Sequence, residues 1–398
     1  MPQPALSPEP ADAPVILSNE PGSFPWSVLA ERHPALIRKV QGAFPYGPEQ
    51  HRALDALLKN GAEGVIEPLG RAAADRAQWD TWGQGRFGRS WFDVPFLWSE
   101  SYFYRQLLEA VGYFAPGPWN GIDPFRPFKL AELDTPEADE ELAALDALAD
   151  RPVEEQGKAL LHGALWGNRA DLGFSLAGPG AGAVTEQLVA DDSALLWPLF
   201  MGGTVCLVAD NAGRELIPDL LLIDHLLRHR HAERAVLHVK PYPYYVSDAT
   251  TADVVDALRR LTAAQGAAAE AGHRLWSAMT EGRLTVRAHP FSCAPLPYAD
   301  IPDDLRREFA EADVTVMKGD LNYRRLVGDR LRPPTTPFAS TTAYFPGPVA
   351  ALRTLKSDVI VGLDAHTEAA LVAAEDQRWR VSGTHALIQV KSPGAAAT

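Results

Sequence analysis

Cysteines and long apolar runs are scarce in this chain of 398 residues. Its only two cysteines are Cys206 and Cys293. Two thiols cannot form a disulfide framework or a four-thiolate zinc site. No stretch reaches the roughly 18 consecutive apolar residues that a membrane-spanning helix needs. The amino-terminal segment also lacks a basic region followed by an apolar core, which a secretory signal would have. We therefore predict a cytoplasmic protein.

Positively charged residues are fewer than negatively charged ones. Lysine and arginine number 37 against 51 aspartates and glutamates, which gives a formal net charge of −14. Nucleic-acid binding depends on basic residues that neutralise phosphates, and adsorption to anionic membranes depends on basic clusters. The composition therefore predicts neither nucleic-acid nor membrane partners and favours a small-molecule ligand. It leaves the oligomeric state open.

The length and composition are those of a globular protein with a large core. Apolar residues make up 46% of the chain and charged residues 22%. A chain of this length suggests two domains, at roughly 100–200 residues per domain. The pattern predicts five parts: a flexible arm (1–24), an α-helical domain (25–165), a linking segment (166–190), an α/β catalytic domain (191–392) and a tail (393–398).

Apolar periodicity separates the two large parts. Up to about His162 apolar residues recur at helical spacing, and a long aromatic-rich helix is expected at Phe96–Tyr113. Beyond residue 190, short β-branched runs alternate with amphipathic helices, which predicts an α/β/α sandwich with a mainly parallel, Rossmann-like central sheet. The expected strands are Thr204–Val208, Ala235–Val239, Leu284–Arg287, Val314–Met317, Val359–Gly362 and Ala386–Val390.

Polar clusters stand at the ends of these strands, where ligands bind in such sheets. Asp210 and Asn211 follow the first strand, with Glu215 one helical turn later. Ser247 and Asp248 follow the second strand, and the segment Lys318–Arg324 follows the fourth. A further cluster, Arg353-Thr-Leu-Lys356, is expected just before the strand at Val359.

The first two clusters have the chemistry of a site for a hard divalent cation. Such a cation prefers a few carboxylate and amide oxygens, with water in the remaining positions. Asp210, Asn211 and Asp248 supply that set from neighbouring strand ends. The same residue types also serve as helix caps and turns, so the prediction depends on several clusters meeting at one edge.

The other clusters offer positive charge for a phosphate. Lys318, Arg324 and Lys356 carry it, and Gly319 allows the backbone before a helix that starts near Asp320 to approach an anion closely. Oxygen ligands beside basic groups suit metal-assisted phosphoryl chemistry.

The same segments resemble the DUF89 family of metal-dependent damage-control phosphatases, and within it the group named after acidic residue methyltransferase. The similarity covers most of the chain in separate pieces that keep the family's order, which makes the set far more specific than any one piece. These are Phe96–Arg105, Leu165–Leu172, Val189–Ser193, Asp210-Asn-Ala-Gly-Arg-Glu215, His238-Val-Lys-Pro, Val246-Ser-Asp248, Lys318-Gly-Asp-Leu-Asn-Tyr-Arg324 and the RTxK motif Arg353-Thr-Leu-Lys356.

The resemblance implies roles for individual residues. Asp210, Asn211 and Asp248 correspond to the family's metal ligands. Glu215, the segment Lys318, Gly319, Asp320, Leu321 and Asn322, and Lys356 correspond to substrate-contacting positions. Ala212 stands where the family usually has a bulkier residue, which leaves the metal set intact but alters the pocket floor.

The family name also carries a second activity. A carboxyl methyltransferase that uses S-adenosylmethionine would need a glycine-rich cofactor loop after a strand. The Gly/Ala-rich stretch Ala177–Ala183 follows only a weak strand candidate, and Pro179 stiffens its turn, so it is more typical of an interdomain link. The methyltransferase remains an alternative function, as does a non-catalytic sugar-phosphate-binding protein.

The sequence thus predicts a metal-dependent phosphatase acting on a small phosphate monoester, such as fructose 1-phosphate or fructose 6-phosphate. Mg, Mn, Co and Ni all suit the predicted ligands. Asp210, Asn211, Asp248 and Asp320 are the predicted catalytic residues, and either Asp320 or Glu215 is expected to be the base that activates the water.

Overall fold

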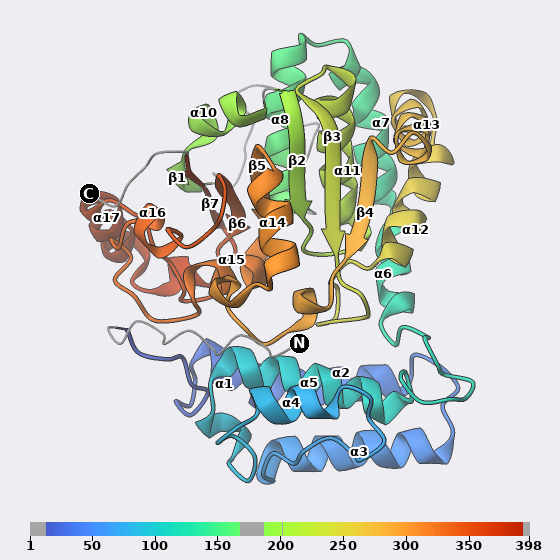
Figure 1. Ribbon diagram of the computed structural model, residues 1–398, viewed down its shortest axis with the longest axis vertical. Coiled ribbons are helices and arrows are strands. Elements are labelled where there is room, and N and C mark those ends of the chain that lie inside the picture. Colours follow the sequence, from blue (N-terminus) through green and yellow to red (C-terminus); the bar gives the residue numbers. More distant parts are fainter. Residues whose placement is uncertain (1–12, 168–186, 201, 393–398) are drawn as a thin grey trace.

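A seven-stranded sheet forms the centre of the protein (Figure 1). The computed structural model describes residues 13–167, 187–200 and 202–392. The strands lie side by side in the order β1-β7-β6-β5-β2-β3-β4. Their bounds are β1 Gln187–Asp191, β2 Gly202–Val208, β3 Ala232–Val239, β4 Leu284–Ala288, β5 Val314–Lys318, β6 Val349–Thr354 and β7 His385–Lys391.

The sheet is mainly parallel. Strands β2 to β6 pair in parallel, whereas β7 runs antiparallel to β6 and parallel to β1. The carboxyl ends of five strands therefore meet at one edge. The predicted α/β class with a mainly parallel sheet is confirmed.

Helices cover both faces of the sheet. Alternate residues of the central strands point to opposite faces, as β5 shows: Val314 and Val316 belong to one apolar cluster, and Met317 belongs to the other. The helices from residue 126 onward are α6 Arg126–Leu133, α7 Pro136–Ala149, α8 Val153–Trp166, α10 Ser193–Leu196, α11 Leu216–Arg228, α12 Thr251–Thr262, α13 Gly266–Thr280, α14 Asp303–Glu311, α15 Gly319–Val327, α16 Phe338–Thr341 and α17 Ala365–Glu375. The first face is covered by α8, α11, α12 and α13, and the second by α14, α15 and α16.

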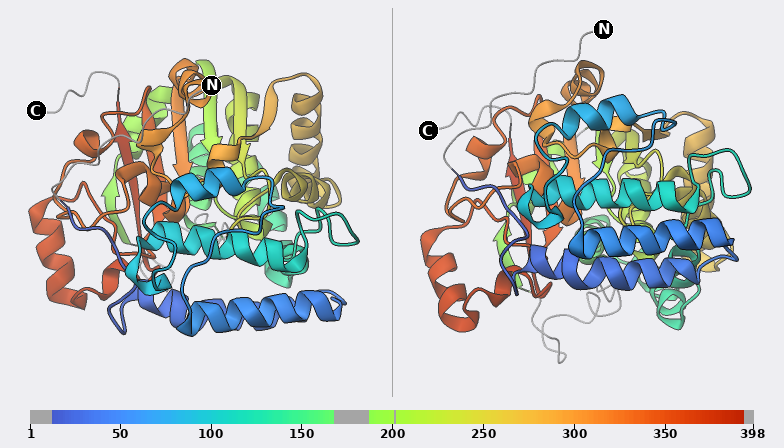
Figure 2. Two further views of the ribbon diagram at one scale, coloured as in Figure 1. Left: turned by 60° about the horizontal axis from the view of Figure 1, so that its bottom comes forward. Right: turned by 90° about the horizontal axis from the view of Figure 1, so that it is seen from below.

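The first five helices form a separate layer below the carboxyl edge of the sheet (Figures 1 and 2). Because the arrowheads of β2, β3 and β4 point toward this layer, it faces the edge at which the polar clusters lie. Its helices are α1 Phe24–Ser27, α2 His33–Gln41, α3 Pro48–Glu63, α4 Arg76–Trp82 and α5 Phe96–Val111.

Helix α5 is the central element of that layer. It begins after Pro95 and ends at Gly112, whose φ of 84° permits the left-handed cap that closes many helices. Aromatic side chains such as Trp98 and Tyr102 fill the layer's core. The same helix buries polar residues, among them Glu100 and Ser101. Buried polar groups need partners, and these two find theirs in the α/β part.

The division into domains stays a prediction, but two packing relationships bear on its boundaries. Helices α7 and α8 contribute to the apolar cluster on the sheet, not to the core of the α1–α5 layer. The segment before α1 makes backbone contacts with the rest of the protein. The Ile16 carbonyl accepts a hydrogen bond from Phe96 N at 2.9 Å, and Val15 forms a β-bridge with Arg330.

Two differences from the predicted strands concern the site. Val359–Gly362 is an irregular segment, so the strand expected there is wrong. A strand that was not predicted, β6, instead ends at Thr354, so Lys356 follows a strand like the other clusters. Strand β1 was also missed, since its run Gln-Leu-Val-Ala-Asp offers little alternation. Residues 177–183 lie outside the described part of the chain.

None of the helices in the described ranges has the length and apolar character needed to cross a membrane.

Candidate active site at the carboxyl edge of the sheet

The site lies where the chain reverses its direction of travel across the sheet. From β2 the chain moves outward to β3 and β4, then returns to place β5 on the other side of β2. Such a reversal leaves a crevice between the two neighbouring strand ends, and ligands bind there in open α/β sheets. Asp210 leaves β2 and Lys318 ends β5, so these two residues border the crevice.

A small pocket occupies this crevice, with about 30 Å³ of open space. That is enough for an ion or a water molecule. Six residues predicted from the sequence line it: Asp210, Asn211, Glu215, Lys318, Gly319 and Lys356. The remaining lining residues are Ala164, Leu165, Trp166, Gly167, Asp219, Leu352 and Thr354.

Two carboxylates meet beside the pocket. Asn211 forms a β-bridge with Asp248, and Ala249 N donates to the Asp210 carbonyl at 2.9 Å, so the end of β2 and the loop after β3 are held together. Burial, together with the charges of Asp248 and Glu215, raises the pKa of Asp210 well above its usual range. Burial also raises the pKa of Asp248, although Lys240 opposes this effect. The arrangement therefore concentrates negative charge that a cation would neutralise.

The oxygens of this group are not saturated by protein donors. Asp248 Oδ2 is buried, and among the described residues it has an ion pair with Lys240 Nζ at 3.3 Å but no further hydrogen bond. Asn211 Oδ1 accepts from Ser247 Oγ at 2.7 Å, which leaves one lone pair on that oxygen. Its Nδ2 donates to Glu215 Oε2 at 2.6 Å, which fixes the side chain.

These donors fit a hard divalent cation. Two carboxylates and one amide oxygen are the ligands such an ion prefers when water completes its shell. Within the described ranges, no group of three or more His, Cys, Asp or Glu side chains is arranged for a metal. An Asp-Asn-Asp set is consistent with that result because its third member is an amide.

The two lysines of the pocket differ in their surroundings. Lys318 Nζ pairs with Asp219 Oδ1 at 2.9 Å and donates to the Ala164 carbonyl, so it ties β5 to α11 and to the last turn of α8. Lys356 is exposed, and no described residue forms an ion pair or hydrogen bond with its side chain. Its ammonium group is therefore free to meet an incoming anion.

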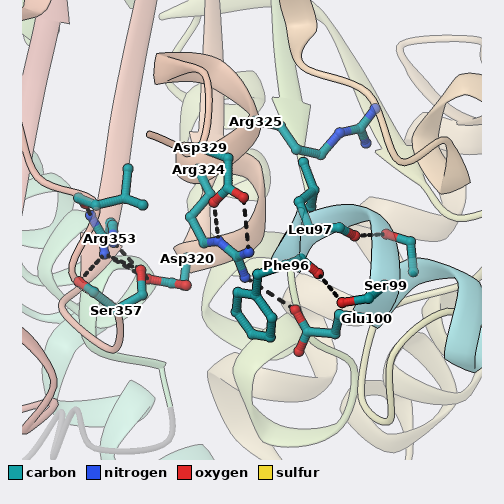
Figure 3. A network of polar contacts seen from close by, with 12 residues as sticks. Phe96, Leu97, Ser99, Glu100, Asp320, Arg324, Arg325, Asp329, Arg353 and Ser357 are labelled. Carbon is teal, nitrogen blue, oxygen red and sulfur yellow. Dashed lines mark hydrogen bonds and ion pairs between the residues drawn. The ribbon is translucent and has the colours of Figure 1, made fainter. Parts of the chain in front are cut away.

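Four predicted site residues on α15 lie away from the pocket lining. Asp320 pairs with Arg353 at 2.7 Å and accepts from Ser357 Oγ at 2.9 Å (Figure 3). Although burial opposes it, Arg353 and then Arg324 hold the pKa of Asp320 below its usual value. Arg324 is buried and forms ion pairs with Asp329 and Glu100. Both side chains are therefore held by protein partners and do not line the pocket.

The other two α15 residues contact neighbouring parts of the protein. Asn322 Nδ2 donates to the carbonyls of Ala209 and Lys318 at 3.0 and 2.8 Å, so it joins the ends of β2 and β5. Leu321 packs with Leu97 and Tyr244. Their place near substrate thus stays a prediction from the family resemblance.

Sequence reasoning missed Asp219 and gave Lys240 no role, although it noted Lys240 in the His238-Val-Lys-Pro motif. Asp219 lies four residues after Glu215, a spacing that places two side chains on one helix face, and this was the signal available for it. Lys240 directly follows β3, yet only the structure shows its pairing with Asp248.

A profile of the damage-control phosphatase ARMT1-like domain matches residues 28–372 of the chain. The protein belongs to this family. The match includes helices α2–α5 and strands β1–β6, so the helical layer and the sheet both contribute to the family's domain. Membership places the protein among the damage-control phosphatases.

Two damage-control phosphatases agree with this assignment. The damage-control phosphatase ARMT1 of Danio rerio is 28% identical over an alignment that covers 94% of this chain and 95% of the relative. The Xenopus laevis protein of the same name is 31% identical over 76% of each chain. A crystal structure of a DUF89 family protein from Pyrococcus horikoshii aligns with 83% of this chain and 92% of its own, at 15% identity and a TM-score of 0.45.

Proposed function

We propose that this protein hydrolyses a phosphate monoester of a small metabolite, with one divalent cation at Asp210, Asn211 and Asp248. A sugar phosphate such as fructose 1-phosphate or fructose 6-phosphate is the proposed substrate, and Mn, Mg, Co or Ni the proposed metal. The observation that carries the proposal is the pair of buried carboxylates with raised pKa values, Asp210 and Asp248, beside a pocket that the exposed Lys356 also lines. We also retain the cytoplasmic location, with no nucleic-acid or membrane partner, as part of this proposal.

The proposed chemistry divides among the pocket's side chains. A cation bound at the Asp-Asn-Asp set supplies a Lewis acid that polarises the P–O bond. The Lys356 ammonium group binds the phosphate and offsets the charge that develops on its oxygens. Lys318, held by Asp219, adds positive charge from the pocket wall. A water oxygen forms the new bond to phosphorus while the ester P–O bond breaks. The leaving alkoxide takes up the proton that the attacking water loses, so that the alcohol and phosphate are released.

Glu215 is the better of the two candidate bases. It lines the pocket, whereas Asp320 is engaged by Arg353 and Ser357. Asn211 occupies Glu215 Oε2, so Oε1 can accept the proton of the attacking water. A base must lie within hydrogen-bond reach of that water, and position therefore favours Glu215.

The test uses metal-stripped protein and a panel of sugar phosphates. Phosphate release is measured with Mg, Mn, Co or Ni added back, for the wild type and for Asp248→Asn. The substitution keeps the size of the side chain but removes its charge, so we expect turnover and metal binding to be lost with an unchanged circular dichroism spectrum. Asp80→Asn is the control, because Asp80 lies on α4, away from the pocket, in a partly exposed ion pair with Arg76.

Near-normal turnover in Asp248→Asn would remove the metal-site assignment. Absence of phosphate release with every metal would instead favour the methyltransferase or the sugar-phosphate-binding protein, and titration with S-adenosylmethionine would then separate these two.

A further inference from the structure

Two consecutive residues of α5 bind two consecutive tyrosines of the loop between β3 and α12. Tyr244 OH donates to Ser101 Oγ at 2.6 Å, and Tyr245 OH donates to Glu100 Oε2 at 3.1 Å. Glu100, Ser101 and Tyr244 are buried. The α1–α5 layer therefore holds this loop through two side-chain hydrogen bonds, and Tyr245 is the one partly exposed partner.

The loop it holds carries Asp248. Three residues before Asp248, Tyr245 has a φ of 50°, a left-handed conformation that is unfavourable for a residue with a bulky side chain. The Tyr245 ring stacks on Tyr104 of α5, with 4.7 Å between ring centroids. Contacts from α5 thus support a backbone conformation that local preference opposes, and the loop reaches the end of β2 in that conformation.

Glu100 has a second partner on the other side of the site. Its carboxylate pairs with Arg324 Nη1 at 3.2 Å, and the guanidinium group of Arg324 lies 4.6 Å above the Phe96 ring (Figure 3). Arg324 belongs to α15, the helix that begins at Gly319 against Asp210. One buried carboxylate therefore joins the loop that carries Asp248 to the helix that packs on Asp210.

We propose that Glu100 is a positioning residue for the metal site, which acts through Tyr245 and Arg324. It holds the Asp248 loop and α15 at the spacing at which Asp210 and Asp248 share one cation. Glu100 does not line the pocket. The inference rests on the metal site of the proposed function.

Two substitutions separate the two links. Glu100→Gln keeps an oxygen for Tyr245 but removes the charge that faces Arg324. Tyr245→Phe keeps the ring against Tyr104 but removes the hydrogen bond to Glu100. Glu109→Gln is the matched control. Glu109 lies on the same helix, but its side chain is partly exposed and pairs with Arg105.

The readout is Mn²⁺ affinity measured by calorimetry on metal-stripped full-length protein without substrate. Partners behind the direct ligands of a metal typically change its affinity by about tenfold or more. We expect Glu100→Gln to weaken Mn²⁺ binding about tenfold, Tyr245→Phe to weaken it by a smaller factor because it removes one of the two links, and Glu109→Gln to leave it unchanged. Urea unfolding of each variant reports whether the fold is retained.

The outcomes distinguish the possible roles. Folded Glu100→Gln with wild-type Mn²⁺ affinity but a raised KM would mean that Glu100 contacts substrate, and would overturn the proposal. If Glu100→Gln does not fold, Tyr245→Phe decides, and wild-type affinity in that variant would also overturn it. A wild-type protein that binds Mn²⁺ no better than Asp248→Asn would instead refute the metal site itself.

Discussion

Gly319 lies directly against the carboxylate of Asp210. A β-carbon at residue 319 would be 1.8 Å from Asp210 Oδ2, and the φ of Gly319 is +81°. The absence of a side chain thus allows the first turn of α15 to pack on a proposed metal ligand. The position requires glycine for both its backbone conformation and its close approach.

Gly319→Ala should therefore disrupt the proposed metal site. The added methyl group forces the Asp210 side chain to move, and the left-handed conformation alone costs roughly 1–2 kcal/mol. We expect at least about a tenfold loss of Mn²⁺ affinity, by analogy with displaced ligand partners, together with a lower melting temperature. Calorimetry and thermal unfolding measure the two effects.

Gly328→Ala provides the control for this prediction. Gly328 has a φ of +96°, but the nearest atom to an added β-carbon is Arg332 Nη2 at 3.7 Å. This variant should lose comparable stability and keep its metal affinity. Equal Mn²⁺ affinities in the two variants would show that the contact with Asp210 is unimportant.

Lys356→Ala should impair phosphate binding and leave the fold intact. Lys356 is exposed and without an ion-pair partner among the described residues. A charge-assisted hydrogen bond contributes about 1.5–3 kcal/mol, which corresponds to an increase in KM of roughly tenfold to a hundredfold. Steady-state kinetics and inhibition by inorganic phosphate measure the change, with Lys158→Ala on the exposed face of α8 as the control. Unchanged values of both KM and kcat would argue against the assigned role.

Glu215→Gln and Asp320→Asn test which carboxylate is the base. Loss of a general base lowers kcat by about 10²–10⁴, so we expect Glu215→Gln to do this while the protein stays folded. Asp320→Asn leaves the buried guanidinium of Arg353 without its charged partner, and breaking such a pair destabilises a protein by about 3–5 kcal/mol. We therefore expect Asp320→Asn to lower the melting temperature first. A stable Asp320→Asn protein with a similarly low kcat would favour Asp320 instead.

His33 should make stability depend on pH. It is buried and stacks on Phe103 with 3.6 Å between ring centroids, and burial lowers its pKa to about 3. The unfolded chain therefore binds a proton near its usual pKa of about 6.5 while the folded chain does not. Stability from this group is complete above about pH 6.5 and is lost as the pH falls toward 3.

The measurement compares the free energy of unfolding in urea at pH 7 and pH 4.5 for the wild type and His33→Gln. The contribution of His33 over that interval is on the order of 2–3 kcal/mol. The wild type should lose that much more stability than the variant. An equal loss in both proteins would show that His33 titrates normally in the folded state.

Several features of the site could be predicted from the sequence. Parallel strands end at one edge, so residues that follow β2 and β3 had to meet, and Asp210, Asn211 and Asp248 do. Lys356 lines the same pocket as Asp210 and Asn211, although it follows β6, whereas the sequence predicted that it precedes a strand. Val359–Gly362 has β-branched residues but pairs with no strand, whereas the short β6 gains its strand character from its neighbours β5 and β7.

What the sequence alone determined was the fold class and the residue types that follow the strands, because apolar periodicity and strand-end residue types are local properties. The tertiary structure decided which charges remain available to a ligand. In the sequence, Asp320, Lys318 and Arg324 are equally good candidates for site residues. In the structure, each forms an ion pair with a residue that is distant in the chain or on a neighbouring element. The contact between Glu100 and Arg324 spans 224 residues. Such pairs form only when packing removes both groups from water, so no local pattern in the chain could identify them.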